Sequence, residues 1–250
     1  MEKISAVWSF FAILAFLISR NPVSEKIGKK IRRSYCKIET KENFSRRRNA
    51  DMIVAGKIRC VNCMKKMNIV RHRCLRCGFR QETYQPLPYH MNPGTVLANR
   101  YSIGRVLGEG NFGIVYLAWD LVLEQKTAIK EYFPKNAIRR DWIRGVDAHI
   151  KIENDKKFAA RREQFEKEAG YLSRFSRLDN VCRVVDYFNE NGTAYIVTQY
   201  IEGMSLKKYM EKYGKFNEAQ TISLLLPLVQ SLAEIHKTGL LHRDINPSNI

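Results

Sequence analysis

Residues 241–250 read Leu-His-Arg-Asp-Ile-Asn-Pro-Ser-Asn-Ile, and the rest of the chain can be understood from this stretch outward. An aspartate, Asp244, is followed five positions later by an asparagine, Asn249. Gly239 comes shortly before and is expected to end a helix, because glycine accepts the backbone conformation that closes helices. The stretch is therefore predicted to be a loop that presents Asp244 and Asn249.

Helices are predicted immediately upstream of this loop. Ser205 is expected to cap a short helix, and Asn217 with Gln220 reads as the cap of a longer helix that ends near Lys237. Pro227 is expected to kink the longer helix. Its buried stripe is predicted to consist of Leu224, Leu228, Leu232 and Ile235. Before the helices, two strands are predicted at residues 181–187 and 193–200, on either side of an Asn-Glu-Asn-Gly turn.

A glycine-rich stretch, Gly108-Glu-Gly110-Asn-Phe-Gly113, follows an alternating segment that predicts a strand. The Gly-x-Gly-x-x-Gly pattern alone is weak evidence, since dinucleotide-binding folds also use it. Here residues 114–119 are β-branched and aromatic, which favours a second strand over a helix. A strand, glycine loop and strand form a flap whose backbone N–H groups can approach phosphates without obstruction by Cβ atoms. A further short strand, residues 126–130, ends in Lys130.

In this order, the motifs resemble a eukaryotic-type serine/threonine protein kinase of the kind found in bacteria, over residues 101–250. The resemblance implies an α+β fold: an N-lobe with an antiparallel sheet and helix C, then the first part of a helical C-lobe. It implies ATP and Mg²⁺ as cofactors and proteins as substrates.

The resemblance also implies roles for individual residues. Asp244 would accept the proton of the substrate hydroxyl, Asn249 would hold Mg²⁺, and Lys130 would grip the α- and β-phosphates. Thr198 would be the gatekeeper behind the adenine. The other residues implied to contact the nucleotide are Leu107, Gly108, Gly110, Gly113, Val115, Ala128 and the backbone near Gln199 and Tyr200.

The partner of Lys130 is predicted on a helix with a stripe at Phe165, Ala169, Leu172 and Phe175. Glu168 lies on this stripe and matches the helix-C glutamate that pairs with the strand lysine in the resembled family. Glu163 and Glu166 are the alternatives. The long charged segment at residues 134–162 is interpreted as an insertion before this helix.

Two departures from the family's pattern affect the expected activity. Asn246 stands where serine/threonine kinases commonly have a lysine that neutralises the γ-phosphate. It leaves an alternative open: a pseudokinase or scaffold that binds nucleotide and docks partners. No Asp-Phe-Gly or Ala-Pro-Glu motif occurs in the 250 residues. The sequence is therefore expected to be a fragment that is itself inactive.

Residues 59–80 are predicted to form a zinc ribbon. Two Cys-x-x-Cys pairs, Cys60 with Cys63 and Cys74 with Cys77, are separated by ten residues and can present four thiolates to a structural zinc ion. Four free thiols in a linker are the alternative. The ribbon is expected to be a docking or regulatory module; nucleic-acid binding is not favoured, since only Phe79 is aromatic there. Residues 81–100, with three prolines, are predicted to be a linker.

Charge is unevenly distributed in the 250 residues. Residues 1–90 carry 20 Lys/Arg against 6 Asp/Glu, whereas residues 91–250 carry 23 against 19. The composition, 45% hydrophobic and 27% charged, excludes a disordered chain, and the cysteine spacing excludes a secreted disulfide scaffold.

The N-terminal arm is divided into residues 1–20, a candidate membrane anchor, and residues 21–58, a basic linker. The uncharged stretch at residues 4–19 is short for a membrane span. If it inserts, the basic residues after it should keep the kinase domain in the cytoplasm, and the arm could touch an anionic membrane surface. A signal peptide, or a translation start at Met52, are the alternatives. The sequence makes no prediction of oligomeric state.

Overall fold

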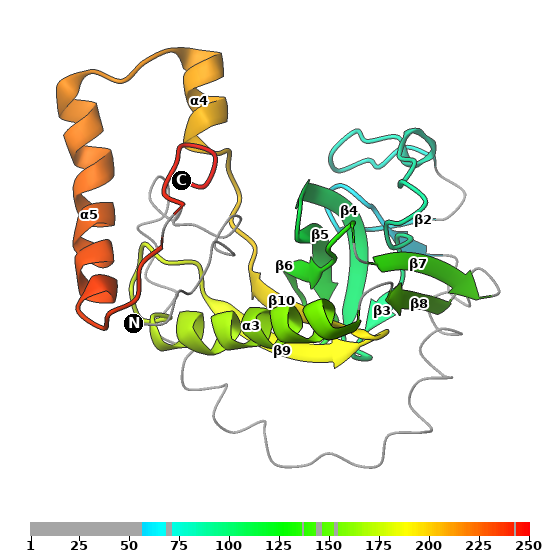
Figure 1. Ribbon diagram of the computed structural model, residues 1–250. Coiled ribbons are helices and arrows are strands. Elements are labelled where there is room, and N and C mark those ends of the chain that lie inside the picture. Colours follow the sequence, from blue (N-terminus) through cyan, green and yellow to red (C-terminus); the bar gives the residue numbers. More distant parts are fainter. Residues whose placement is uncertain (1–56, 69–71, 137, 144–146, 153–154, 243) are drawn as a thin grey trace.

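The computed structural model describes residues 57–68, 72–136, 138–143, 147–152, 155–242 and 244–250 (Figure 1). The candidate membrane anchor and most of the basic linker lie outside these ranges. Within the described ranges, the structure contains no helix with the length and apolarity that a membrane span requires.

A six-stranded antiparallel sheet forms the centre of the N-terminal part, with the strand order β3-β4-β5-β6-β10-β9. The bounds are β3 Val96–Leu97, β4 Tyr101–Gly110, β5 Gly113–Asp120, β6 Gln125–Tyr132, β9 Val184–Glu190 and β10 Thr193–Gln199. The predicted antiparallel sheet is confirmed, and β9 lies three residues later than its prediction. The β9–β10 turn uses Asn191 and Gly192, both with positive φ.

The register of the sheet assigns side chains to its two faces, because residues paired across an antiparallel ladder point to the same side. Val115 pairs with Lys130, and Ile196 pairs with Lys130 from the other neighbour. Ile114 pairs with Glu131. We call the side that carries Lys130 the inner face and the side that carries Glu131 the outer face.

One long helix, α3 (Asp155–Arg174), packs against β9 and β10 (Figure 1). Phe165 of α3 is fully buried and lies against Tyr132, with ring centroids 5.5 Å apart. Phe175 follows the helix directly instead of belonging to it. Helix α3 therefore covers the inner face, on the side of Lys130.

The segment interpreted as an insertion has structure of its own. A hairpin of β7 (Ile138–Ile143) and β8 (Asp147–Ile152) precedes α3, and the helix already begins at Asp155. Arg140 of β7 explains why the hairpin stays on the sheet, since its guanidinium forms a buried ion pair with Glu131, 2.6 Å away.

Residues 81–100, predicted as a linker, pack on the sheet. Beyond a short 3-10 helix, η1 (Gln81–Thr83), the chain buries Met91 and Leu97 completely in the main hydrophobic core and forms β3. The prolines led to the prediction of a linker, whereas Met91 and Leu97 attach the segment to the core of the sheet.

Two helices follow the sheet, α4 (Leu206–Tyr213) and α5 (Glu218–His236), and lie to one side of it (Figure 1). Both caps agree with their predictions: Ser205 accepts a hydrogen bond from Lys208, and Asn217 and Gln220 form a reciprocal capping box. Helix α5 continues on both sides of Pro227. Leu228 and Ile235 are its buried apolar residues.

The small module before the sheet consists of β1 (Lys57–Arg59), β2 (Lys66–Asn68) and two tight cysteine turns. In the first turn, the N–H of Met64 donates to the carbonyl of Cys60, and in the second, the N–H of Gly78 donates to that of Cys74, each at 2.8 Å. Met64 and Gly78 both have positive φ. The two turns thus have the same geometry.

Candidate functional site

The glycine-rich stretch forms the turn between β4 and β5. Gly110 pairs with Gly113 at the end of the ladder, as the predicted flap requires. A Cβ atom on Gly113 would lie only 2.5 Å from the carbonyl oxygen of Glu131 on the neighbouring strand. The third glycine is therefore needed for the close approach of two strands, whatever it contributes to phosphate binding.

Lys130 and Glu168 form an ion pair between the sheet and α3. The Nζ atom of Lys130, on β6, lies 3.2 Å from Oε1 of Glu168, on α3, and both side chains are buried. Burial raises the pKa of Glu168, while the charge and hydrogen bond of Lys130 oppose that rise.

The alternative partners for Lys130 point elsewhere. Glu163 pairs with Lys167 at 2.8 Å, and Glu166 lies 3.6 Å from Arg162, both within α3. The geometry thus singles out Glu168 among the three glutamates.

The residues predicted around the adenine line the inner face between β5 and β10. Leu117 pairs with Ala128 and Val115 with Lys130, so Val115 and Ala128 share the face of the lysine. Thr198 is buried next to them, and its hydroxyl donates to the carbonyl of Ala128 at 3.4 Å.

The backbone N–H and carbonyl of Gln199, at the end of β10, differ in the contacts they already make. The N–H of Gln199 already donates to the carbonyl of Arg183, and the carbonyl of Gln199 accepts a weak contact from the Cys182 thiol at 3.6 Å. An adenine edge could therefore compete for the carbonyl of Gln199 but not for its N–H. Tyr200 and Leu107 pack together with Met64 of the cysteine module.

The loop after α5 holds Asp244 from two sides. Asn246 donates to Oδ1 of Asp244 and Asn249 donates to Oδ2, each at 2.9 Å. Asn249 also donates to the backbone carbonyl of Asp244. Asn246 thus orients the carboxylate, although it brings no positive charge.

The same loop is fixed to the start of α4. The N–H groups of Leu206 and Lys207 donate to the carbonyls of Ile250 and Pro247, at 2.6 and 2.7 Å. His242 is buried beside the loop, and burial lowers its pKa. Arg243 lies outside the described residues.

The structure brings the predicted catalytic residues together in two clusters. One is the Lys130–Glu168 pair between sheet and helix, and the other is Asp244 with Asn249 in the loop. Their chemistry is complementary: a buried cation suits bound phosphates, and an oriented carboxylate suits a hydroxyl proton.

The four cysteines of the two turns converge. Their Sγ atoms all lie within 4.8 Å of one another, with 3.6 Å between Cys60 and Cys77 and 3.7 Å between Cys63 and Cys74. A tetrahedral zinc with bonds of about 2.3 Å requires sulfur–sulfur edges of roughly 3.8 Å. The donor set fits zinc.

The thiols of this cluster differ in environment. Burial raises the pKa of Cys63 to about 12. Burial also acts on Cys77, but hydrogen bonds from the backbone of Phe79 and from Asn62 outweigh it and lower its pKa to about 7. The exposed Cys77 is therefore more easily deprotonated as a ligand than Cys63.

The cysteine module rests directly on the sheet. Met64 is buried against Leu117 and Trp119, and the N–H of Arg105 donates to the carbonyl of Val61 at 3.0 Å. A Cβ on Gly104 would come within 2.6 Å of the Met64 sulfur. Gly104 thus makes room for the module.

Residues that the sequence did not single out surround Glu109 of the glycine stretch. Tyr89, His90 and Lys135 all contact its carboxylate. An acidic residue inside a predicted phosphate loop was the available signal, because such a charge needs cationic or hydrogen-bonding neighbours.

Known proteins with similar sequences carry the same domain. The family described as "Protein kinase domain" matches residues 101–250. Serine/threonine-protein kinase PrkC of Bacillus subtilis is 32% identical over 157 residues, which are 63% of this chain and 21% of that protein. Serine/threonine-protein kinase B of Synechocystis sp. is 28% identical over 176 residues, 65% of this chain and 28% of that protein.

The fold is also found among solved structures. The structure titled "PpkA-294 apo form" aligns with a TM-score of 0.58 at 38% identity. The alignment covers 64% of this chain and 57% of that structure's chain. This chain spans between a fifth and a third of the length of the two curated relatives. With a match over residues 101–250 and the fold that goes with it, the chain belongs to the protein kinase domain family.

Proposed function

We propose that the protein is an ATP-dependent serine/threonine kinase that transfers the γ-phosphate to hydroxyl groups of other proteins. The observation that carries the proposal is the buried Lys130–Glu168 ion pair beside the glycine turn. A buried pair of this kind is costly for stability, so its presence at this place supports a functional role.

The residues present fit the nucleotide and its metal. Oε2 of Glu168 is buried with no hydrogen-bond partner in the described part of the chain, so a hydrogen-bond donor, but not an anionic phosphate oxygen, could still bind to it beside Lys130. The amide nitrogen of Asn249 is occupied by Asp244, so its oxygen is the atom it would offer to Mg²⁺.

In the proposed reaction, bound ATP supplies the phosphoryl group. Lys130 places a positive charge against the α- and β-phosphates, and Glu168 holds the lysine in position. Asp244 accepts the proton of the substrate hydroxyl. Asn246 and Asn249 fix the direction of its carboxylate by their two hydrogen bonds.

Asn246 supports a second candidate, a scaffold that binds nucleotide without transferring phosphate. Its amide reproduces a hydrogen bond to Asp244 but cannot neutralise charge on a transferred phosphoryl group. In that case the cysteine module would be a docking site for partners.

Radiolabelled ATP distinguishes the two candidates. The protein from its complete reading frame is incubated with Ser, Thr and Tyr peptide libraries, and Asp244→Asn and Lys130→Met are the test variants. The kinase proposal expects transfer to Ser and Thr peptides that falls at least about 100-fold in each variant. Transfer that persists in Asp244→Asn contradicts the role of Asp244. The scaffold would be identified by a wild type that binds ATP without transferring phosphate, together with transfer that appears in Asn246→Lys.

We also propose that the four cysteines hold a structural zinc ion. The tetrahedral spacing of their sulfur atoms supports this assignment.

A further inference from the structure

We propose that residues 84–91, here called the strap, hold the glycine loop from behind through Glu109 and so set the protein's affinity for the phosphates of ATP. The inference rests on the proposed ATP binding. It gives Glu109 the role of a positioning residue, which acts through the loop and does not touch the nucleotide.

The register of the sheet shows on which side Glu109 lies. Glu109 pairs with Ile114, and Ile114 pairs with Glu131. Because paired residues share a face, the Glu109 side chain lies on the outer face, opposite to Lys130. In the loop, the glycines therefore occupy positions of the inner face, where no side chain intervenes, and the one carboxylate points to the outer face.

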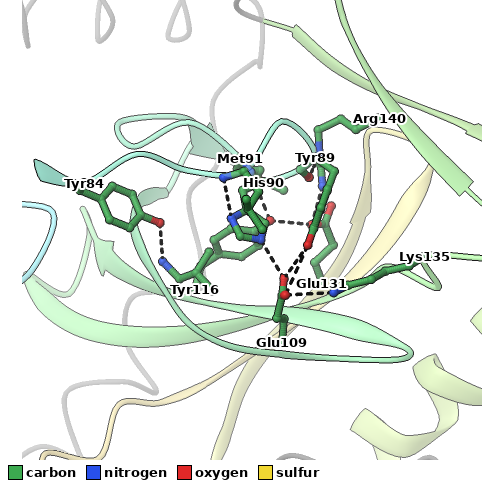
Figure 2. A network of polar contacts seen from close by, with 11 residues as sticks. Tyr84, Tyr89, His90, Met91, Glu109, Tyr116, Glu131, Lys135 and Arg140 are labelled. Atoms are coloured by element: carbon green, nitrogen blue, oxygen red, sulfur yellow. Dashed lines mark hydrogen bonds and ion pairs between the residues drawn. The ribbon is translucent and has the colours of Figure 1, made fainter.

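Three side chains meet that carboxylate (Figure 2). Nε2 of His90 lies 2.8 Å from Oε2 of Glu109, the Tyr89 hydroxyl lies 3.3 Å from both oxygens, and Nζ of Lys135 lies 3.0 Å from Oε1. Nδ1 of His90 accepts the N–H of Leu87, so Nε2 is the nitrogen that carries the proton and donates to Glu109. The carboxylate is thus held in one direction.

The strap is itself firmly attached to the sheet, as Figure 2 shows. The Tyr84 hydroxyl accepts the N–H of Val106 at 2.8 Å, and the N–H of Met91 donates to the Tyr116 hydroxyl at 3.2 Å. The strap therefore grips β4 at Val106 and at Glu109, on either side of Gly108.

The middle of the strap is attached to the hairpin. The carbonyl of Tyr89 accepts a hydrogen bond from Nε of Arg140 at 2.8 Å, and Arg140 is paired with Glu131. The Tyr89 ring stacks on Phe133, with centroids 5.9 Å apart. Because the strap is fixed both to the sheet and to the hairpin, it can restrain the glycine loop.

Charge explains why Glu109 needs this surrounding. A carboxylate next to the phosphates of ATP would repel them unless it were neutralised. Partial burial opposes its ionisation, but hydrogen bonds from His90 and Lys135 outweigh burial and lower its pKa. The carboxylate is thus ionised at neutral pH, paired with Lys135, and turned away from the inner face.

The test compares a ligand that uses the loop with one that does not. ATP and adenosine are titrated by calorimetry into the wild type, Glu109→Ala, Glu109→Gln, His90→Ala and Lys135→Met. We expect the Kd for ATP to rise about tenfold in Glu109→Ala and His90→Ala, and less in the other two, while the Kd for adenosine changes less than about twofold. Glu234→Gln, which removes an exposed Glu–Lys pair on α5, is the matched control and should change neither.

Two results would overturn the proposal: unchanged ATP affinity in Glu109→Ala and His90→Ala, or equal losses of ATP and adenosine, which would mean general damage to the lobe. If the wild type binds no ATP, the proposed function fails instead. In that case, amide hydrogen exchange at residues 108–113 tests without nucleotide whether the strap restrains the loop. Faster exchange in Glu109→Ala or Lys135→Met supports the restraint, and unchanged exchange refutes it. Lys135→Met serves where Glu109→Ala does not fold, since Lys135 is a third exposed.

Discussion

Glu168 shows how a single residue can cost stability and still be needed. Its pKa is raised above the ordinary value, because burial outweighs the attraction of Lys130. For a carboxyl with a raised pKa, the contribution to stability is complete below the unfolded pKa and is lost as pH rises through the folded pKa. At neutral pH the pair thus stabilises the fold less than its short distance suggests.

Lys130→Met should make this cost visible. Without the lysine, the pKa of Glu168 rises further, so the variant is expected to match the wild type near pH 5 and to lose about 3 kcal/mol by pH 8. Urea unfolding across this range measures it. The double variant Lys130→Met/Glu168→Gln carries no buried charge at these positions and should recover most of the loss. A single variant with the same pH profile as the wild type would contradict the account.

Two single residues show what the sequence could and could not predict. The contact between Glu168 and Lys130 was expected, because a carboxylate on an apolar helix stripe needs a partner and the resembled family pairs a helix glutamate with the strand lysine. Asn246 was seen only as a missing charge, since its hydrogen bond to Asp244 depends on the loop's conformation. No local pattern encodes such a contact.

At the scale of elements, the close approach of the cysteine module to β4 decides which glycines are replaceable. Gly104→Ala would place a methyl group 2.6 Å from the Met64 sulfur and 3.1 Å from the Leu117 carbonyl. We expect a loss of about 1–3 kcal/mol in urea unfolding, with faster amide exchange at Arg105, whose N–H donates to the module.

Gly170→Ala is the matched control for this variant. Gly170 lies within α3, and apart from its chain neighbours and the helix's own backbone no atom of the described residues lies within 4 Å of the place that an added methyl group would take. The substitution should stabilise the protein by about 0.5–1 kcal/mol, because alanine favours a helix. Equal effects of the two substitutions would refute the proposed contact.

Elements with a strong pattern were predicted and those held by distant partners were not. The capped helix α5 and the strands around the glycine turn have local signals that agree with the fold. The β7–β8 hairpin and the strap are charged or proline-rich, and their place depends on partners such as Glu131 and Glu109 far along the chain. Tertiary contacts override weak local preference in both.

At the scale of the whole molecule, the sheet and the cysteine module meet on the inner face, which carries Lys130. Met64 of the module forms one buried cluster with Leu117 and Trp119 of the sheet, and Leu107 and Tyr200, both predicted to contact the adenine, pack against this cluster. A change in the module's fold should therefore reach the residues that are predicted to bind the nucleotide.

Zinc removal tests whether the module depends on its metal. So small a unit cannot bury enough apolar surface to fold alone, so zinc should supply much of its stability. The purified protein is expected to contain one zinc per chain by elemental analysis, and a chelator should lower its unfolding temperature.

Cys60→Ser should lose the zinc, because the fully buried Cys60 cannot be replaced by a water ligand. Cys182→Ser is the control: Cys182 is buried outside the cluster and should keep the full zinc content. Equal zinc content in the two variants would show that the four sulfur atoms do not form the site, and the packing of Met64 on the sheet would then stabilise the module without a metal.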